Sequence, residues 1–130
     1  MYKEPSKEID QLATLVVDAA LDVHRVLGPG FLESVYEEAL SVELTLRGIP
    51  FERQKGVGVS YKNHQVGQGK IDILVAGRLV VELKAVEALA PIHTAQVLSY
   101  LKSAGLSLGL LINFNVSLLK NGIKRVILSS

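Results

Sequence analysis

The stretch that decides the fold runs from Lys70 to Lys84 and reads Lys-Ile-Asp-Ile-Leu-Val-Ala-Gly-Arg-Leu-Val-Val-Glu-Leu-Lys. Two runs rich in Val, Ile and Leu, at residues 71–75 and 79–83, flank a short turn around Gly77. Such runs on either side of a glycine turn predict a β-hairpin. Because both runs are apolar almost throughout, they are typical of strands that are covered on both faces of a sheet.

This hairpin also carries Asp72, Glu82 and Lys84. Ionisable side chains are rarely buried unless they are paired or bind a metal, so three of them in a central hairpin point to a functional site. Glu82 and Lys84 are two residues apart and therefore project from the same face of a strand.

The position of the turn decides whether the two acids meet. If the hairpin is centred on Gly77, Asp72 lies directly opposite Glu82, with Cβ atoms about 4.5–5.5 Å apart. Two carboxylates that close repel unless a cation lies between them, and oxygen ligands suit Mg²⁺ or Mn²⁺. A two-residue turn at Gly77-Arg78 would instead pair Ile73 with Glu82 and place Asp72 on the other face.

Length and composition limit the possible classes of protein. The 130 residues predict one domain, 1–130, and a formal charge of +1 does not indicate a strongly basic nucleic-acid binder. The absence of cysteine excludes disulfides and thiolate metal sites. The polar N-terminus has no signal-peptide core, and no segment has the length and apolarity of a membrane span, so we expect a cytoplasmic protein without membrane contact. The 48% hydrophobic content favours a homo-oligomer that buries some of this surface between subunits.

Three amphipathic helices are predicted. The first covers residues 7–27 with Ser6 as its cap, and its His24 is interpreted as a core-edge or surface histidine rather than a ligand. The second covers residues 32–47, and the third follows Pro91 and ends near Ala104. The buried stripe predicted for the second helix consists of Leu32, Val35, Tyr36, Ala39, Leu40 and Leu46.

Four strands besides residues 79–83 are expected. Residues 51–61 and 65–75 flank a polar turn at Lys62-Asn63-His64, and their glycines predict weak or bulged strands. Residues 106–114 predict a central strand, and residues 123–128 a final one after the Asn121-Gly122 turn. The scattered lysines of these segments favour a solvated face, although Lys70 lies on the same face as Asp72 and could neutralise it.

Three polar residues on the helices are further candidates for the site. Glu33 lies in a first helical turn, where the helix dipole alone would favour a carboxylate, or it reaches the pocket of Asp72 and Glu82. Gln96 and Tyr100 are four residues apart and share a helix face. For these two, core packing and an ordinary hydrogen bond are alternatives that the sequence leaves open.

The motifs resemble those of a known family. Asp72 followed by Glu82-Leu83-Lys84 resembles the catalytic pattern of the PD-(D/E)XK nuclease superfamily, with Ile71 in place of the proline. Gly30-Phe-Leu-Glu33-Ser-Val-Tyr36 is similar to the Gly-x-x-Glu-x-x-Tyr motif of the GxxExxY family within that superfamily. Three further stretches that look like this family complete the resemblance over residues 8–128: Val81–Val86, Ala95–Leu101 and Gly109–Asn115.

The resemblance implies an α/β fold with a restriction-endonuclease-like core, in which helices flank a mixed sheet, and a metal-dependent attack on phosphodiesters. It implies Asp72, Glu82, Glu33 and the Leu83 carbonyl as ligands of Mg²⁺ or Mn²⁺. Lys84 would orient the attacking water, and Gln96 and Tyr100 would support the site and the nucleic-acid strand. The residues are compatible with the chemistry that the resemblance implies, because a divalent ion and a lysine can both stabilise charge on a phosphate.

Three functions remain open at this stage. The first is a nuclease acting on DNA or RNA. The second is a binding or assembly module that keeps the fold but has little activity, which the near-neutral charge favours. The third is a dimer whose paired surface binds nucleic acid without cutting it.

Overall fold

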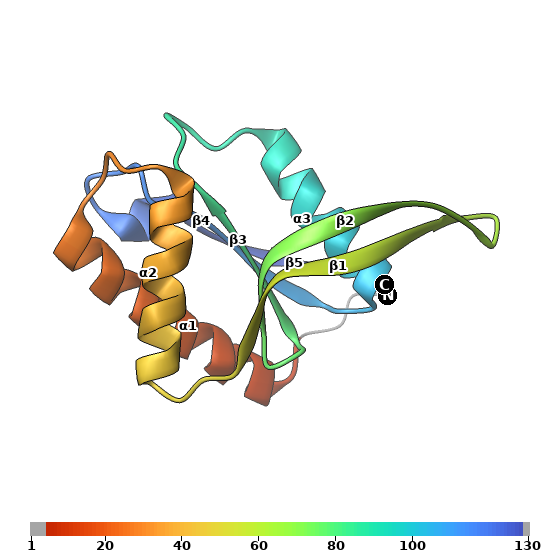
Figure 1. Cartoon of the computed structure of the whole chain (residues 1–130), viewed down its shortest axis with the longest axis horizontal. Helices are drawn as coiled ribbons and strands as arrows, with labels where there is room; N and C mark the ends of the chain where they lie inside the picture. The colour runs from red at the N-terminus through yellow and green to blue at the C-terminus, as the bar shows by residue number, and fades with distance from the viewer. Residues whose placement is uncertain (1–4, 129–130) are drawn as a thin grey trace.

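The computed structural model describes residues 5–128 and contains a five-stranded mixed sheet with α-helices on both faces (Figure 1). The strands lie in the order β1-β2-β3-β4-β5. All neighbouring pairs are antiparallel except β3 and β4, which are parallel. Parallel neighbours need a crossover connection, and α3 supplies it. In chain order the elements are α1 (Lys7–Leu27), α2 (Glu33–Leu46), β1 (Phe51–Tyr61), β2 (His64–Val75), β3 (Leu79–Lys84), α3 (Pro91–Ala104), β4 (Leu108–Asn113), a 3₁₀ turn η1 (Leu119–Gly122) and β5 (Ile123–Ile127).

Alternation along the central strands divides the core in two. Leu79, Val81 and Leu83 of β3 pack with buried residues of α1 and α2, whereas Val80 packs with Val97 and other residues of α3. Every residue of β4 is buried, as is every residue of β3 except Lys84, which is partly exposed. The prediction of strands covered on both faces is therefore confirmed, and the α/β fold is that of a restriction-endonuclease-like core.

Helix α1 begins and ends at the residues that the sequence predicts. Ser6 accepts a hydrogen bond from the Ile9 N–H at 3.3 Å, and Gly28, at φ 70°, donates its N–H to the His24 carbonyl at 2.8 Å. The His24 ring is buried and makes a 2.8 Å hydrogen bond with the Val116 carbonyl. The interpretation of His24 as a histidine of the core edge is confirmed. No helix within residues 5–128 is long and apolar enough to cross a membrane.

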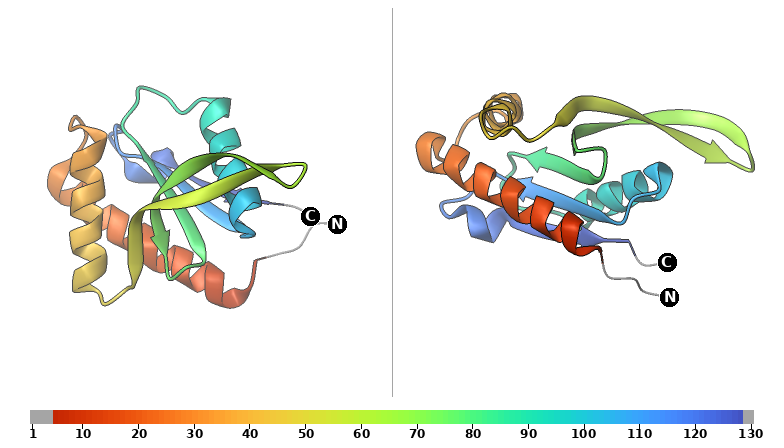
Figure 2. Two further views of the ribbon diagram at one scale, coloured as in Figure 1. Left: turned by 45° about the vertical axis from the view of Figure 1, so that its right-hand side comes forward. Right: turned by 90° about the horizontal axis from the view of Figure 1, so that it is seen from below.

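The β1–β2 hairpin is longer than the rest of the sheet requires. β2 pairs with β1 from His64 to Val75, but with β3 only from Ile73 to Val75. Its tip, Lys62-Asn63, has φ values of 49° and 65°, as in the tight turns that suit twisted hairpins. The distal part of the hairpin consequently projects beyond the body of the protein (Figures 1 and 2).

The buried stripe predicted for α2 is wrong in part. Tyr36 and Leu40 are buried as expected, but Leu32 and Leu46 are each 76% exposed, and Val35 is also exposed. The buried face of α2 consists of Tyr36, Glu37, Leu40, Ser41 and Leu44. The physical reason is that α2 has a second stripe, Tyr36, Leu40 and Leu44, and this one packs in the core. The same buried face carries Glu37, which is connected to Asp72 through Gln54.

Candidate metal centre

The centre of the candidate site is the point where β2 and β3 separate. Regular pairing ends at Ile73 and Val81, which makes Asp72 and Glu82 the next opposed residues. At this position the backbone N–H groups donate hydrogen bonds to side-chain carboxylates and no longer to backbone carbonyls of the neighbouring strand. The Asp72 N–H donates to Glu82 Oε2 at 2.7 Å, and the Leu83 N–H donates to Asp72 Oδ2 at 2.9 Å. The register centred on Gly77 is confirmed, and the alternative two-residue turn is wrong.

The carboxylate of Glu82 lies in an unfavourable environment for a charge. The residue is 2% exposed. Burial, and after it the negative charge of Asp72, raises the pKa of Glu82 to about 8, against the opposing effects of the Asp72 N–H and of Lys84. Near neutral pH this carboxylate is therefore largely protonated unless a cation stabilises its charge.

Glu33 reaches the same region from α2 because a tyrosine anchors the preceding loop. Tyr36 is fully buried and stacks on Phe114 at 4.5 Å. Its hydroxyl donates to the Gly28 carbonyl at 2.6 Å and accepts the Phe31 N–H at 3.2 Å. Gly30 has φ 109°, which side-chain-bearing residues rarely adopt. The glycine, glutamate and tyrosine of the motif thus set the start of α2, whose first residue is Glu33.

The other charged groups of the site change the pKa of Glu33. Burial raises the pKa of Glu33, the charges of Asp72 and Glu37 raise it further, and Lys84 lowers it. The environment of this acid is therefore set by more than the dipole of α2.

Gln96 and Tyr100 approach from α3, on the face of the sheet that carries Glu82. Gln96 Nε2 donates to the Tyr100 hydroxyl at 3.4 Å. Burial raises the pKa of Tyr100, and the negative charge of Glu82 raises it further. The ring crosses β2 at Gly69, where an added Cβ would come within 2.5 Å of Tyr100 Cε1. Tyr100 is therefore close to the paired acids, whereas the exposed Gln96 is connected to them only through the Tyr100 hydroxyl.

Lys84 and Leu83 lie at the end of β3. Lys84 is partly exposed, and its charge lowers the pKa of both Glu82 and Glu33 against the larger effect of burial. The segment after Lys84 is held by Asn113, whose side chain accepts the Val86 N–H at 3.0 Å and donates to the Val86 carbonyl at 2.9 Å. Lys84 therefore projects from a fixed backbone.

Two residues that the sequence analysis did not indicate, Gln54 and Glu37, connect Asp72 to α2. Gln54 Nε2 lies 2.9 Å from Glu37 Oε1 and 3.4 Å from Asp72 Oδ1. Arg53 forms a 3.1 Å ion pair with Glu37. Glu37 lies four residues after Glu33, a spacing that places both on one helix face and could have identified it. Gln54 has φ 50° and lies where regular pairing of β1 with β2 is interrupted, which only the structure shows.

The donor set fits a divalent cation held mainly by two carboxylates. Within residues 5–128 no group of three or more His, Cys, Asp or Glu side chains is arranged to hold a metal ion. Mg²⁺, however, is usually bound through one or two protein carboxylates and keeps several waters. Asp72 and Glu82 face each other, and the buried Glu82 needs positive charge nearby. Two opposed carboxylates match the number of protein carboxylates through which such an ion is usually bound.

Comparison with known families matches residues 10–126 to the PD-(D/E)XK nuclease superfamily. The match covers most of the chain, so the protein belongs to this superfamily. Its members are typically metal-dependent, in keeping with the opposed carboxylates. Comparisons with curated proteins and with solved structures gave no match.

Proposed function

We propose that the protein is a metal-dependent nuclease that hydrolyses phosphodiester bonds in DNA or RNA, and that it is a member of the GxxExxY family. The observation that carries the proposal is the pairing of Asp72 with Glu82. One acid is buried, both are fixed by backbone hydrogen bonds, and the pKa of Glu82 is raised to about 8. Perturbed acids brought together in this way are typical of a site that binds a cation and performs chemistry.

Each proposed site residue has a defined role. Asp72, Glu82 and the Leu83 carbonyl would hold Mg²⁺ or Mn²⁺. Glu33 would complete the site from α2 after a movement of its side chain, because within residues 5–128 no three acids are grouped to hold an ion. When bound, the ion would supply Lewis-acid stabilisation of charge on the phosphate oxygens. Lys84 orients the attacking water and donates positive charge to the developing negative charge on the phosphate. Four further side chains would support the site through their hydrogen bonds: Gln96, Tyr100, Gln54 and Glu37.

The distribution of charge supports a nucleic-acid substrate in spite of the net charge of +1. From Arg53 to Ile71 the β1–β2 hairpin contains four Lys or Arg residues and no Asp or Glu. Arg53 and Lys55 form ion pairs with Glu37, Glu38 and Glu52, so Lys62 and Lys70, which make no ion pair within residues 5–128, provide most of its positive charge. Helices α1 and α2 together contain eight acidic and two basic residues. Asp72 follows the basic hairpin directly. A basic arm beside the candidate site is suited to hold a phosphate backbone without reading its sequence.

The test is cleavage of single- and double-stranded DNA and RNA with Mg²⁺ or Mn²⁺. We expect hydrolysis by the wild type and its loss in Asp72→Ala and Lys84→Ala. Lys102→Ala is the matched control, because Lys102 is exposed on α3 and makes no ion pair within residues 5–128. Cleavage that persists in both site variants would assign the activity to a contaminant.

The second candidate is a nuclease-fold module for binding or assembly with little activity. The large exposed apolar surface over α1 and α2 favours it. Absence of cleavage on every substrate, with retained binding of Mn²⁺, would select this function. Salt-sensitive binding of nucleic acid without cleavage, unchanged in Asp72→Ala, would identify a surface that binds without cutting.

A further inference from the structure

The outward face of α2 carries a regular apolar stripe that is mostly exposed within residues 5–128; only its Ala39 packs partly against the core. It begins at the N-cap residue Leu32 and continues through α2 at alternating intervals of three and four residues. We call this set the outer stripe: Leu32, Val35, Ala39, Val42 and Leu46. Leu32 and Leu46 are each 76% exposed and Val42 is 53% exposed. This spacing is the one by which helices pack side by side against other helices.

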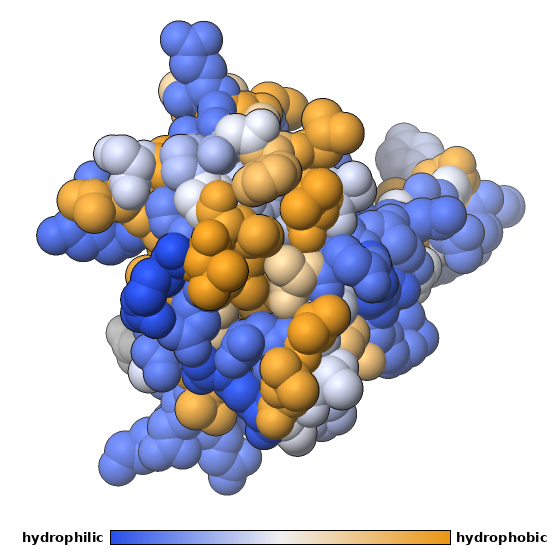
Figure 3. All heavy atoms as spheres, turned by 60° about the vertical axis from the view of Figure 1, so that its left-hand side comes forward, coloured by the Kyte–Doolittle hydropathy of each residue, from blue (hydrophilic) through white to orange (hydrophobic). Residues whose placement is uncertain are grey.

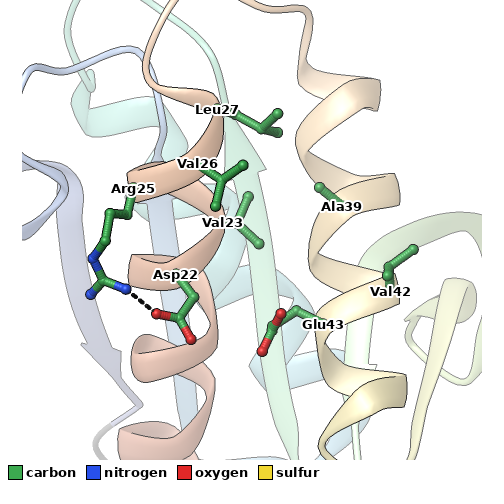
Figure 4. Close-up of a pocket in the computed structure, with 8 residues that line it drawn as sticks. All are labelled: Asp22, Val23, Arg25, Val26, Leu27, Ala39, Val42 and Glu43. Atoms are coloured by element: carbon green, nitrogen blue, oxygen red, sulfur yellow. Dashed lines mark hydrogen bonds and ion pairs between the residues drawn. The ribbon is translucent and has the colours of Figure 1, made fainter.

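Hollows border the outer stripe on both sides. One is a groove of about 420 Å³ between α1 and α2, walled by Val23, Val26, Leu27, Ala39 and Val42 (Figure 4). The other, of about 350 Å³, lies between α2 and β1, with Val42, Leu46 and Phe51 in its lining. Val42 borders both, so the stripe forms a ridge between two depressions. Figure 3 shows apolar side chains gathered over this side of the molecule.

We propose that this face, the outer stripe with the groove beside it, binds a second copy of the chain in a twofold symmetric dimer. The proposal depends neither on metal binding nor on nuclease activity. In such a dimer the same surface is used by both copies, which requires a patch that is complementary to itself. A ridge flanked by hollows meets this requirement, because each ridge can lie in the hollow of the other copy.

The exposed area is suited to a dimer. Five large apolar residues contribute to the face: Val26, Leu32, Val35, Val42 and Leu46. Together they expose on the order of 500 Å² of apolar surface, the upper part of the range for the largest patch on a monomer. A standard interface buries about 800 Å² on each partner, of which about two thirds is apolar in homodimers. The face therefore provides the apolar area of one side of such an interface.

The acidic side chains around the groove are paired within the chain, so they do not require a basic partner. Asp22 pairs with both Arg25 and Arg47, and Glu43 pairs with Arg47 at 2.8 Å. The acids on the groove wall are therefore neutralised within the chain. A second copy with the same internal pairs can approach without leaving a charge unpaired, which favours self-association over capture of a basic partner.

The test is the molar mass in solution over a range of protein concentration, by analytical ultracentrifugation. We expect a dimer for the wild type. Val42→Glu places a carboxylate in the proposed interface, and we expect the dimer dissociation constant to rise by roughly a hundredfold or more. Val66→Glu is the matched control, because Val66 is 59% exposed on the projecting hairpin. We expect this variant to dimerise like the wild type.

A cross-linking experiment keeps the proposal testable if Val42→Glu fails to fold. The chain has no cysteine, so single cysteines can be introduced without background. We expect a bismaleimide to link Val42→Cys into dimers and to leave Val66→Cys monomeric. A wild type that is monomeric at every concentration overturns the proposal, as does a dimer that persists in folded Val42→Glu. Equal cross-linking of the two cysteine variants also overturns it.

Discussion

Asp72 and Glu82 hold each other in place across the point where β2 and β3 separate. The backbone of Asp72 donates to the Glu82 carboxylate at 2.7 Å, and the Asp72 carboxylate accepts the N–H of Leu83, the residue after Glu82, at 2.9 Å. Both acids are therefore oriented by the backbone before any ion binds. The free-energy cost of this arrangement falls mainly on Glu82, which is buried beside a second negative charge.

This cost predicts a stability that decreases as the pH rises. The pKa of Glu82 is raised from 4.5 to about 8 in the folded protein, so between these values the folded state holds a proton that the unfolded state has lost. The free energy of unfolding therefore decreases across this window, by at most about 1.4 kcal/mol per pH unit. We expect Glu82→Gln to remove this decrease and to be more stable than the wild type at about pH 8. Urea unfolding at a series of pH values measures both effects.

Glu87→Gln is the control for the pH experiment, since Glu87 is exposed and follows β3 closely in the chain. We expect it to unfold like the wild type at every pH. If the free energy of unfolding changes with pH in the same way in the wild type and in Glu82→Gln, the pKa of Glu82 is not raised in the folded protein and the prediction is wrong.

Divalent cations should stabilise the fold through the same pair of acids. A ligand that binds only the folded state raises stability by mass action, and a cation also relieves the repulsion between Asp72 and Glu82. We expect Mn²⁺ to raise the melting temperature of the wild type, and to raise it less in Asp72→Asn, which keeps an acceptor for the Leu83 N–H. An equal rise in both proteins would place the bound ion elsewhere.

The two strands of the central hairpin and the turn around Gly77 could be predicted, but the sequence left the register of their pairing open. Both runs are apolar on both faces, so a shift of one residue would still bury apolar side chains, and it is the observed pairing of Ile73 with Val81 that opposes Asp72 to Glu82. The ends of α1 and α3 could also be predicted, because Ser6, Pro91, Gly28 and Gly105 act locally.

The features of the fold and the site that could not be predicted depend on contacts between segments that are distant in the chain. Leu32 and Leu46 belong to a perfectly regular apolar stripe, and only packing against the sheet shows that α2 buries the other one. Gln54 and Glu37 are 17 residues apart in the chain, and their contact depends on an interruption in β1–β2 pairing. A helix with two apolar stripes does not specify by itself which one faces the core.

The contact of Tyr100 with Gly69 predicts that this glycine cannot be replaced. A Cβ at Gly69 would lie 2.5 Å from Tyr100 Cε1, so the ring must move away from the site. We expect Gly69→Ala to cost about 1–3 kcal/mol in the free energy of unfolding. Gly67→Ala is a matched control on the same strand, because an added Cβ there meets no atom within 4 Å. Similar melting temperatures for the two variants would contradict the predicted contact.

The hydroxyl of Tyr36 should stabilise the loop before α2. It donates to the carbonyl of the partly buried Gly28 at 2.6 Å and accepts the Phe31 N–H at 3.2 Å, and Tyr36→Phe leaves both groups without this partner. We expect a loss of about 1–3 kcal/mol in the free energy of unfolding, measured by urea titration. Tyr61→Phe serves as the control, since Tyr61 is 62% exposed on the hairpin. A loss no larger than that of the control would show that the Tyr36 ring anchors the loop by packing alone.

The basic hairpin should account for most of the salt dependence of nucleic-acid binding. Lys62 lies at its tip and Lys70 lies two residues before Asp72, and both are exposed. If each contacts a phosphate, Lys62→Ala and Lys70→Ala should each weaken binding equally for all sequences and reduce the slope of log K against log salt by about 1. Fluorescence anisotropy in EDTA measures binding without cleavage. Lys102→Ala and Lys120→Ala, which also remove exposed lysines, should leave the slope unchanged. Equal effects of all four substitutions would indicate that the whole surface attracts nucleic acid and that the hairpin is not a dedicated arm.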